Sequence, residues 1–399
     1  MVKLGFPITK NPKGKTLAKS MESYFKSGMT AFQICMTPNQ NGSNGKRLDS
    51  KESVEIKELM KQYNVYGVVH GKYIYNFSRQ NCDHQVDQLV QEMILANDID
   101  CDVILHQGKN MPEEKLTRLE ALDNYVRHIT NALEKTIDLN NGILLENSAK
   151  QGNELGYGLE ELAYIYNQFD DSLKPRIGFC LDLCHIFVAG ELDVRKADLV
   201  ELFFARFDSL IKLSNLKCIH FNDSSIPFGE CNDHHGDIYC GYITNPLLGG
   251  SCEGFKIVSQ VAQTNKIPII FETPCGFQSV HVGSQSAWQM KIVQAWAHHD
   301  DKTYLAYVLT HPHLSQVAYE YYTKPKKSKK KSKKSETKNN DDGCNCEEAN
   351  FSVETIVSNQ EISQPVKMPS IDPTLVEPKK KIPIKLKFPL KLKSTVNKQ

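Results

Sequence analysis

Short apolar segments recur along residues 1–272, and longer segments with a helical spacing of apolar positions lie between them. Each short segment is apolar throughout, as expected for a strand that is buried on both faces of a parallel sheet. The eight strands that we predict span residues 2–8, 31–35, 65–70, 102–106, 142–147, 177–182, 216–221 and 267–272. The helices that we predict include residues 16–29, 53–64, 84–97, 113–136, 158–170, 199–210 and 284–299.

The alternation of strands and helices indicates parallel βαβ units. Eight such units in about 300 residues fit a closed barrel better than an open sheet. The pattern therefore predicts an α/β protein whose fold is a (β/α)8 TIM barrel.

The composition changes near residue 323. From Lys324 onward there are 18 lysines and 9 acidic residues, a balance of +9, whereas the preceding residues carry −8. We therefore predict three parts: a barrel domain over 1–303, a helical extension over 304–323, and a disordered lysine-rich tail over 324–399. The partners that we expect for the tail are nucleic acid or an import receptor.

The bulk composition excludes several other classes of protein. No apolar stretch approaches the length of a membrane span, and the first residues lack the apolar core of a signal peptide. We therefore expect an intracellular protein, in the nucleus or the cytoplasm. The twelve cysteines are scattered, and several lie inside predicted strands, which favours reduced core thiols over disulfides.

Most of the predicted strands end in or near a residue that could bind a metal. The nine candidates are His70, His106, Glu146, Asp182, His185, His220, Asp233, His235 and Glu272. Parallel barrel strands end at one rim, where barrel enzymes keep their active sites, so we expect these side chains to converge. Histidine and carboxylate ligands suit catalytic zinc, and the set excludes a structural site of four cysteines. Nine ligands could hold three metals if one carboxylate bridges.

Several motifs resemble those of the endonuclease IV family, the zinc-dependent apurinic/apyrimidinic endonucleases. The order and spacing of the motifs follow that family from about residue 30 to 273. The motifs are ENSAKQGNELG (146–156), IGFCLDLCHIFVAG (177–190), HFND (220–223), DHH (233–235) followed by Gly241, and IPIIFET (267–273).

The resemblance implies a TIM barrel with three zinc ions. The first ion would be held by His70, His106 and Glu146, the second by Glu146, Asp182, His220 and Glu272, and the third by His185, Asp233 and His235. The implied reaction is hydrolysis of the phosphodiester 5′ to an abasic site in double-stranded DNA, giving a 3′-hydroxyl and a 5′-deoxyribose phosphate, with trimming of blocked 3′ ends. Glu146 and Glu272 would be catalytic, and the enzyme would be a monomer that acts in base excision repair.

The resemblance also suggests residues that contact DNA. The HxxY element of the family matches His70 to Tyr73, so Tyr73 and Ile74 are candidates for entering the base stack, although Tyr73 could equally pack the rim. In the loop after the second predicted strand (31–35), Asn39 and Gln40 match the family, whereas Asn41 stands where a basic residue is usual.

Two alternatives stay open from the sequence. Sugar isomerases and epimerases use the same barrel, but with one or two metals, so the third ligand set would be superfluous in them. A DNA-binding protein with a dead site would not need to keep all nine ligands.

The lysine-rich tail lies outside the family core and would suit a eukaryotic or large-DNA-virus protein.

Overall fold

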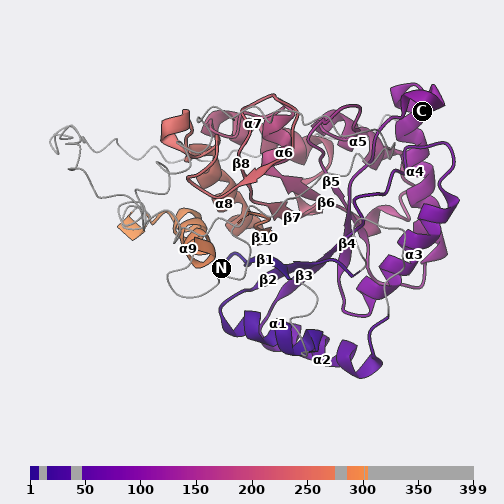
Figure 1. The fold of residues 1–399 in the computed structure, drawn as a ribbon, viewed down its shortest axis with the longest axis horizontal. Helices are drawn as coiled ribbons and strands as arrows, with labels where there is room; N and C mark the ends of the chain where they lie inside the picture. The colour runs from indigo at the N-terminus through magenta and orange to yellow at the C-terminus, as the bar shows by residue number, and fades with distance from the viewer. Residues whose placement is uncertain (9–15, 37–46, 275–284, 301, 304–399) are drawn as a thin grey trace, which may run out of the picture. The chain divides into compact units, whose positions relative to one another are not determined.

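Eight parallel strands form a closed barrel in the order β1-β10-β7-β6-β5-β4-β3-β2, as the computed structural model shows (Figure 1). The structure describes residues 1–8, 16–36, 47–274, 285–300, 302 and 303. The barrel strands are β1 (Leu4–Ile8), β2 (Ala31–Ile34), β3 (Tyr66–His70), β4 (Asp102–Leu105), β5 (Ile143–Glu146), β6 (Ile177–Asp182), β7 (Leu216–His220) and β10 (Ile269–Ile270). Each lies within a predicted strand, so the predicted TIM barrel is confirmed.

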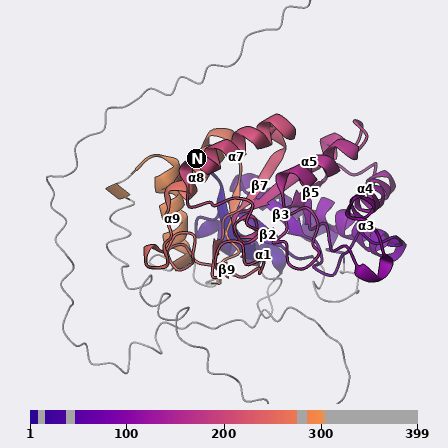
Figure 2. The ribbon, with the colours of Figure 1, turned by 90° about the horizontal axis from the view of Figure 1, so that it is seen from above.

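Helices surround the barrel. In Figure 2, α3 and α4 lie together on one side of the strands, and α8 and α9 lie together on the other. The helices are α1 (Leu17–Lys26), α2 (Ser50–Gln62), α3 (Asp83–Asn97), α4 (Arg118–Lys135), α5 (Leu159–Gln168), α6 (Leu183–Val188), α7 (Ala197–Leu210), α8 (Glu253–Asn265) and α9 (Gln285–Ala297). Short 3₁₀ turns are η1 (Pro112–Glu114), η2 (Lys174–Arg176), η3 (Leu213–Asn215) and η4 (Pro246–Leu248).

The structure differs from the predicted pattern at several loops. α4 begins at Arg118 rather than at residue 113, because Thr117 and Glu120 form a reciprocal capping box. The short helix α6 directly follows β6 and is not among the predicted helices; it begins there because the side chain of Asp182 accepts a hydrogen bond from the backbone of His185. Helix α8 and the two-stranded sheet of β8 (Asp223–Ser224) and β9 (His235–Gly236) lie outside the predicted elements.

Two apolar regions hold the barrel together. The larger lies between strands and helices, with fully buried side chains such as Phe179, Phe207 and Phe255. The smaller fills the barrel interior with one residue from each of seven strands: Ala31, Val68, Ile104, Leu144, Cys180, Cys218 and Ile270. This layer supports the rim from below, so the polar residues at the strand ends are held on a packed base.

The proposed extension over 304–323 and the tail over 324–399 lie outside the described residues. The described part of the chain contains no helix that is both long and apolar enough to cross a membrane.

Candidate metal centre

The predicted ligands are brought together at the carboxyl ends of the barrel strands. His70, Glu146, Asp182 and His220 are the last residues of β3, β5, β6 and β7. The other five lie beyond barrel strands: His106 after β4, His185 in α6, Asp233 between β8 and β9, His235 at the start of β9, and Glu272 after β10. All nine are among the described residues. They form three groups: His70, His106 and Glu146; Glu146, Asp182, His220 and Glu272; and His185, Asp233 and His235. In each group the candidate ligand atoms lie within 4.8 Å of one another.

Glu146 belongs to two of these groups. Its Oε2 atom lies 3.3 Å from Nε2 of His70 and 3.4 Å from Nε2 of His106. Its Oε1 atom lies 2.7 Å from Nδ1 of His220, which also lies 3.1 Å from Oε2 of Glu272 and 3.7 Å from Oδ2 of Asp182. The two oxygens of one carboxylate therefore face different groups, which is the geometry of a bridging ligand.

Asp233 occupies the centre of the third group. Its Oδ2 atom lies 3.1 Å from Nε2 of His185, and its Oδ1 atom lies 3.2 Å from Nε2 of His235. This group is more open than the other two, because about a third of the Asp233 side chain is exposed. A divalent cation there would be held by protein on one side and accessible from solvent on the other.

Three of the histidines have Nδ1 fixed by a backbone carbonyl. Nδ1 of His70 lies 2.8 Å from the carbonyl oxygen of Gly71. Nδ1 of His185 lies 2.9 Å from the carbonyl oxygen of Asn147, and Nδ1 of His235 lies 3.0 Å from that of Glu272. A carbonyl only accepts, so each Nδ1 must donate, and Nε2 is then the nitrogen that can bind a metal.

His220 is oriented the other way. Its Nε2 atom donates to Oε1 of Gln33 at 2.8 Å, so that Nδ1 faces the carboxylates of the second group. Nε2 of Gln33 donates in turn to Oε1 of Glu272 at 2.5 Å. Gln33 on β2 therefore holds a ligand from β7 and a ligand that follows β10.

The ligand atoms themselves give a test of whether a metal fits. Oε2 of Glu146, Nε2 of His185 and Oδ1 of Asp233 are buried and have no hydrogen-bond partner. An unsatisfied buried polar atom costs about 1–3 kcal/mol, so three at one rim need an explanation. Each of these three atoms lies in a group of neighbouring ligand atoms, and a cation bound within that group would satisfy it. The donor set of histidine and carboxylate fits zinc.

Opposite charges control protonation in the site. Burial raises the pKa of Glu146, but His220 and His106 outweigh this effect and hold that pKa well below its usual range. Burial opposes protonation of His235, yet Asp233 raises its pKa to about 10. His106 behaves differently, because burial lowers its pKa to about 4. Without metal, His235 is therefore protonated at neutral pH, and a metal must displace its proton in order to bind.

Two asparagines, like Gln33, were not among the predicted site residues. Nδ2 of Asn222 donates to Oδ2 of Asp182 at 2.6 Å, and its Oδ1 accepts from the backbone of Glu272 at 2.7 Å. Asn147 exchanges hydrogen bonds with the backbone of Asp182 at 2.7 and 3.0 Å. Both lie in the quoted motifs beside a ligand, and Gln33 is a buried amide inside an apolar strand, which is the signal that could have identified it.

Asp223, the last residue of the HFND motif, organises the loop that follows the third group. Its carboxylate accepts from the backbone of Ile243 at 2.8 Å and of Thr244 at 3.1 Å. A Cβ atom at Gly241 would lie 2.3 Å from Oδ1 of Asp223, so only glycine fits there. Burial raises the pKa of Asp223 to about 6 despite these hydrogen bonds.

The candidate DNA-contacting residues fall on both sides of the described boundary. Tyr73 is 56% exposed and Ile74 is 41% exposed, directly after β3. The Tyr73 ring lies 4.7 Å from the ring of His70 and 6.2 Å from that of His106, measured between centroids. An exposed aromatic side chain therefore stands over the first group of ligands. Asn39 and Gln40 lie outside the described residues.

Comparisons with known proteins indicate the family of this chain. A family model described as xylose isomerase-like TIM barrel matches residues 23–275. An Acanthamoeba polyphaga mimivirus protein that carries the name endonuclease 4 is 36% identical over 264 residues, which cover 64% of this chain and 81% of that protein. A Campylobacter concisus protein assigned the same name is 28% identical over 255 residues, covering 62% and 85%.

The crystal structure of endonuclease IV from Thermus thermophilus matches with a TM-score of 0.60 and 25% identity, covering 74% of this chain and 99% of that one. The match to the family model and the extent of the mimivirus alignment lead to one conclusion. The chain belongs to the endonuclease IV family of apurinic/apyrimidinic endonucleases.

Proposed function

We propose that this enzyme hydrolyses the phosphodiester 5′ to an abasic site in double-stranded DNA, leaving a 3′-hydroxyl and a 5′-deoxyribose phosphate, and that the same site trims blocked 3′ ends. The observation that carries the proposal is the convergence of nine ligands into three groups that share Glu146. Membership of a family of DNA-acting hydrolases gives the substrate class.

Three zinc ions are the proposed cofactors, one for each group of ligands. When bound, zinc lowers the pKa of water toward neutrality and offsets negative charge on phosphate oxygens. The protein contributes the arrangement: Glu146 links the first two groups, and Gln33 fixes both His220 and Glu272. In this proposal Glu146 and Glu272 are the catalytic carboxylates, because both approach Nδ1 of His220 in the second group.

Recognition of the lesion is assigned to the loop after β3. Rotating a nucleotide out of a duplex costs least where no base is stacked or paired, which favours an abasic site. Tyr73 and Ile74 expose apolar surface beside His70 and are proposed to fill the gap that the sugar leaves. Asn39 and Gln40 are proposed as further contacts to DNA.

A substitution separates this role of Tyr73 from simple packing. Tyr73→Ala is expected to weaken binding to an abasic duplex much more than binding to an undamaged duplex, with the zinc content unchanged. Equal weakening for both duplexes, or loss of zinc, would mean that Tyr73 only packs against His70 and His106.

The geometry argues against the two alternatives that the sequence left open. A sugar isomerase or epimerase with one or two metals has no use for the third group, yet His185 and His235 each approach Asp233 within 3.2 Å. A catalytically dead DNA-binding protein would not need all nine ligand positions, and all nine converge here.

The remaining proposals concern the rest of the chain. We assign residues 1–303 to the nuclease domain, 304–323 to a helical extension and 324–399 to a lysine-rich tail that binds nucleic acid or an import receptor. The enzyme would act as a monomer inside the cell, in the nucleus or the cytoplasm.

Cleavage of a defined duplex tests the proposed function. The full-length protein is treated with EDTA, and a duplex with one abasic-site analogue is added before and after zinc is restored. We expect a zinc-dependent nick 5′ to the analogue that leaves a 3′-hydroxyl, and no nick in the matched undamaged duplex. Absence of the nick from protein with three zinc ions bound would contradict the proposal.

A further inference from the structure

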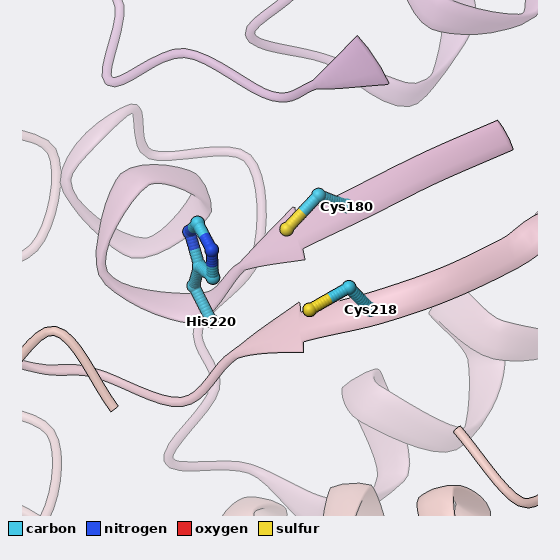
Figure 3. Close-up of side chains that lie close together, drawn as sticks. All are labelled: Cys180, Cys218 and His220. Atoms are coloured by element: carbon cyan, nitrogen blue, oxygen red, sulfur yellow. The ribbon is translucent and has the colours of Figure 1, made fainter. Parts of the chain in front are cut away.

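Two free cysteines face each other inside the barrel, directly below the second group of ligands. Cys180 on β6 and Cys218 on β7 are register partners on adjacent strands, and neither side chain is exposed. Figure 3 shows the two sulfur atoms projecting from neighbouring strands on the side where the ring of His220 lies. The other members of this interior layer are aliphatic, so the two thiols form its polarisable part.

The three side chains are close enough to share one ion. The two sulfurs and a ring nitrogen of His220 lie within 4.8 Å of one another. A metal–sulfur bond of about 2.3 Å places two sulfurs about 3.8 Å apart around a tetrahedral ion and at most about 4.6 Å apart in a linear arrangement. The separation of the two sulfurs, within 4.8 Å, is close to this range.

The donor set determines which ion is favoured. This trio contains sulfur and nitrogen but no carboxylate, whereas each proposed zinc group contains at least one carboxylate oxygen. Soft thiolate ligands select soft cations, and the closed apolar surroundings disfavour strongly hydrated ones. We infer that Cys180, Cys218 and His220 form a separate site for a soft d¹⁰ cation such as Cd²⁺ or Cu⁺.

This site and the second zinc position compete for one ligand. Nδ1 of His220 faces Glu146 and Glu272, and its Nε2 donates to Gln33. An imidazole that turns to the sulfurs gives up these contacts, so a soft cation displaces zinc from the second position. This step rests on the zinc assignment proposed above, whereas binding to the thiol pair does not. Binding of Cd²⁺ forms two metal–sulfur bonds and releases two thiol protons to solvent.

Cadmium titration of the full-length, zinc-loaded protein tests the inference. Cys344→Ser and Cys346→Ser are introduced first, so that the CxC sequence of the tail does not contribute. We expect an ultraviolet sulfur-to-cadmium absorption band at one Cd²⁺ per chain, accompanied by release of one zinc. The band should be lost in Cys180→Ala/Cys218→Ala and kept in Cys101→Ala, which removes a buried cysteine outside the trio.

Two results would overturn the inference. One is an unchanged cadmium band in a folded Cys180→Ala/Cys218→Ala protein. The other needs no barrel substitution: X-ray absorption of the one-cadmium complex showing only oxygen and nitrogen neighbours. A cadmium band without zinc release would keep the thiol site and reject its competition for His220. DNA cleavage is not measured in this experiment, so failure of the proposed nuclease activity is detected separately.

Discussion

Replacement of Gln33 by leucine probes how the barrel orients its ligands. Leucine has a similar size and suits the apolar strand β2, but it cannot form either hydrogen bond of the amide. The change leaves Oε1 of Glu272 without its donor at 2.5 Å and Nε2 of His220 without its acceptor at 2.8 Å. His220 can then adopt the tautomer that carries its proton on Nδ1, which prevents this nitrogen from binding zinc.

The size of the effect follows from these two contacts. A hydrogen bond to a charged group contributes about 1.5–3 kcal/mol, and a tenfold change in affinity corresponds to about 1.4 kcal/mol. Loss of the amide should therefore weaken zinc binding at the second position by about 10- to 100-fold, the range typical of outer partners of metal ligands. The first and third groups do not contact Gln33 directly, so their affinity should change little.

Competition with a chromophoric chelator measures these affinities, and abasic-duplex cleavage measured in parallel should fall with the zinc content. Gln88→Leu is the matched control, because Gln88 is also a buried glutamine but lies on α3 away from the ligands. Full zinc affinity in Gln33→Leu, or an equal loss in Gln88→Leu, would refute the positioning role of Gln33.

Three further predictions address the ligands, their protons and the tail. Glu272→Gln should lower cleavage by more than about 100-fold, the upper end of the range for losing an outer partner alone, while DNA affinity stays largely intact; full turnover would exclude Glu272 as a ligand. Zinc binding to the metal-free protein should release protons at neutral pH and strengthen as pH rises, because the pKa of His235 is raised to about 10. Calorimetry should therefore give heats that depend on the ionisation enthalpy of the buffer, and equal heats would contradict the prediction. Deletion of 324–399 should weaken binding to undamaged DNA and flatten its salt dependence; an unchanged salt slope would assign the tail another role.

The sequence predicts the barrel well because of where its strands lie. Strands buried on both faces appear as continuous apolar runs, and each parallel strand carries its last residue to the same rim. His70, Glu146, Asp182 and His220 could therefore be placed together before any contact was known. Helix boundaries were less accurate where local hydrogen bonds decide them, as in the capping box of Thr117 and Glu120, which is itself visible in the sequence.

The outer partners of the ligands could not be predicted in the same way. Gln33 is 187 residues from His220 and 239 residues from Glu272 in the chain, and only closure of the barrel brings them together. The Cys180–Cys218 pair likewise depends on the register between β6 and β7, which an apolar pattern does not specify. An isolated polar residue in an apolar strand indicates a partner without showing which one it is.

Anomalous diffraction at the zinc edge from crystals of the zinc-loaded protein tests the central claim most directly. We predict three peaks: one between His70, His106 and Glu146, one among Glu146, Asp182, His220 and Glu272, and one between His185, Asp233 and His235. Glu146 should contact the first two. Fewer than three peaks at full zinc loading, or a peak that none of these nine side chains contacts, would contradict the account.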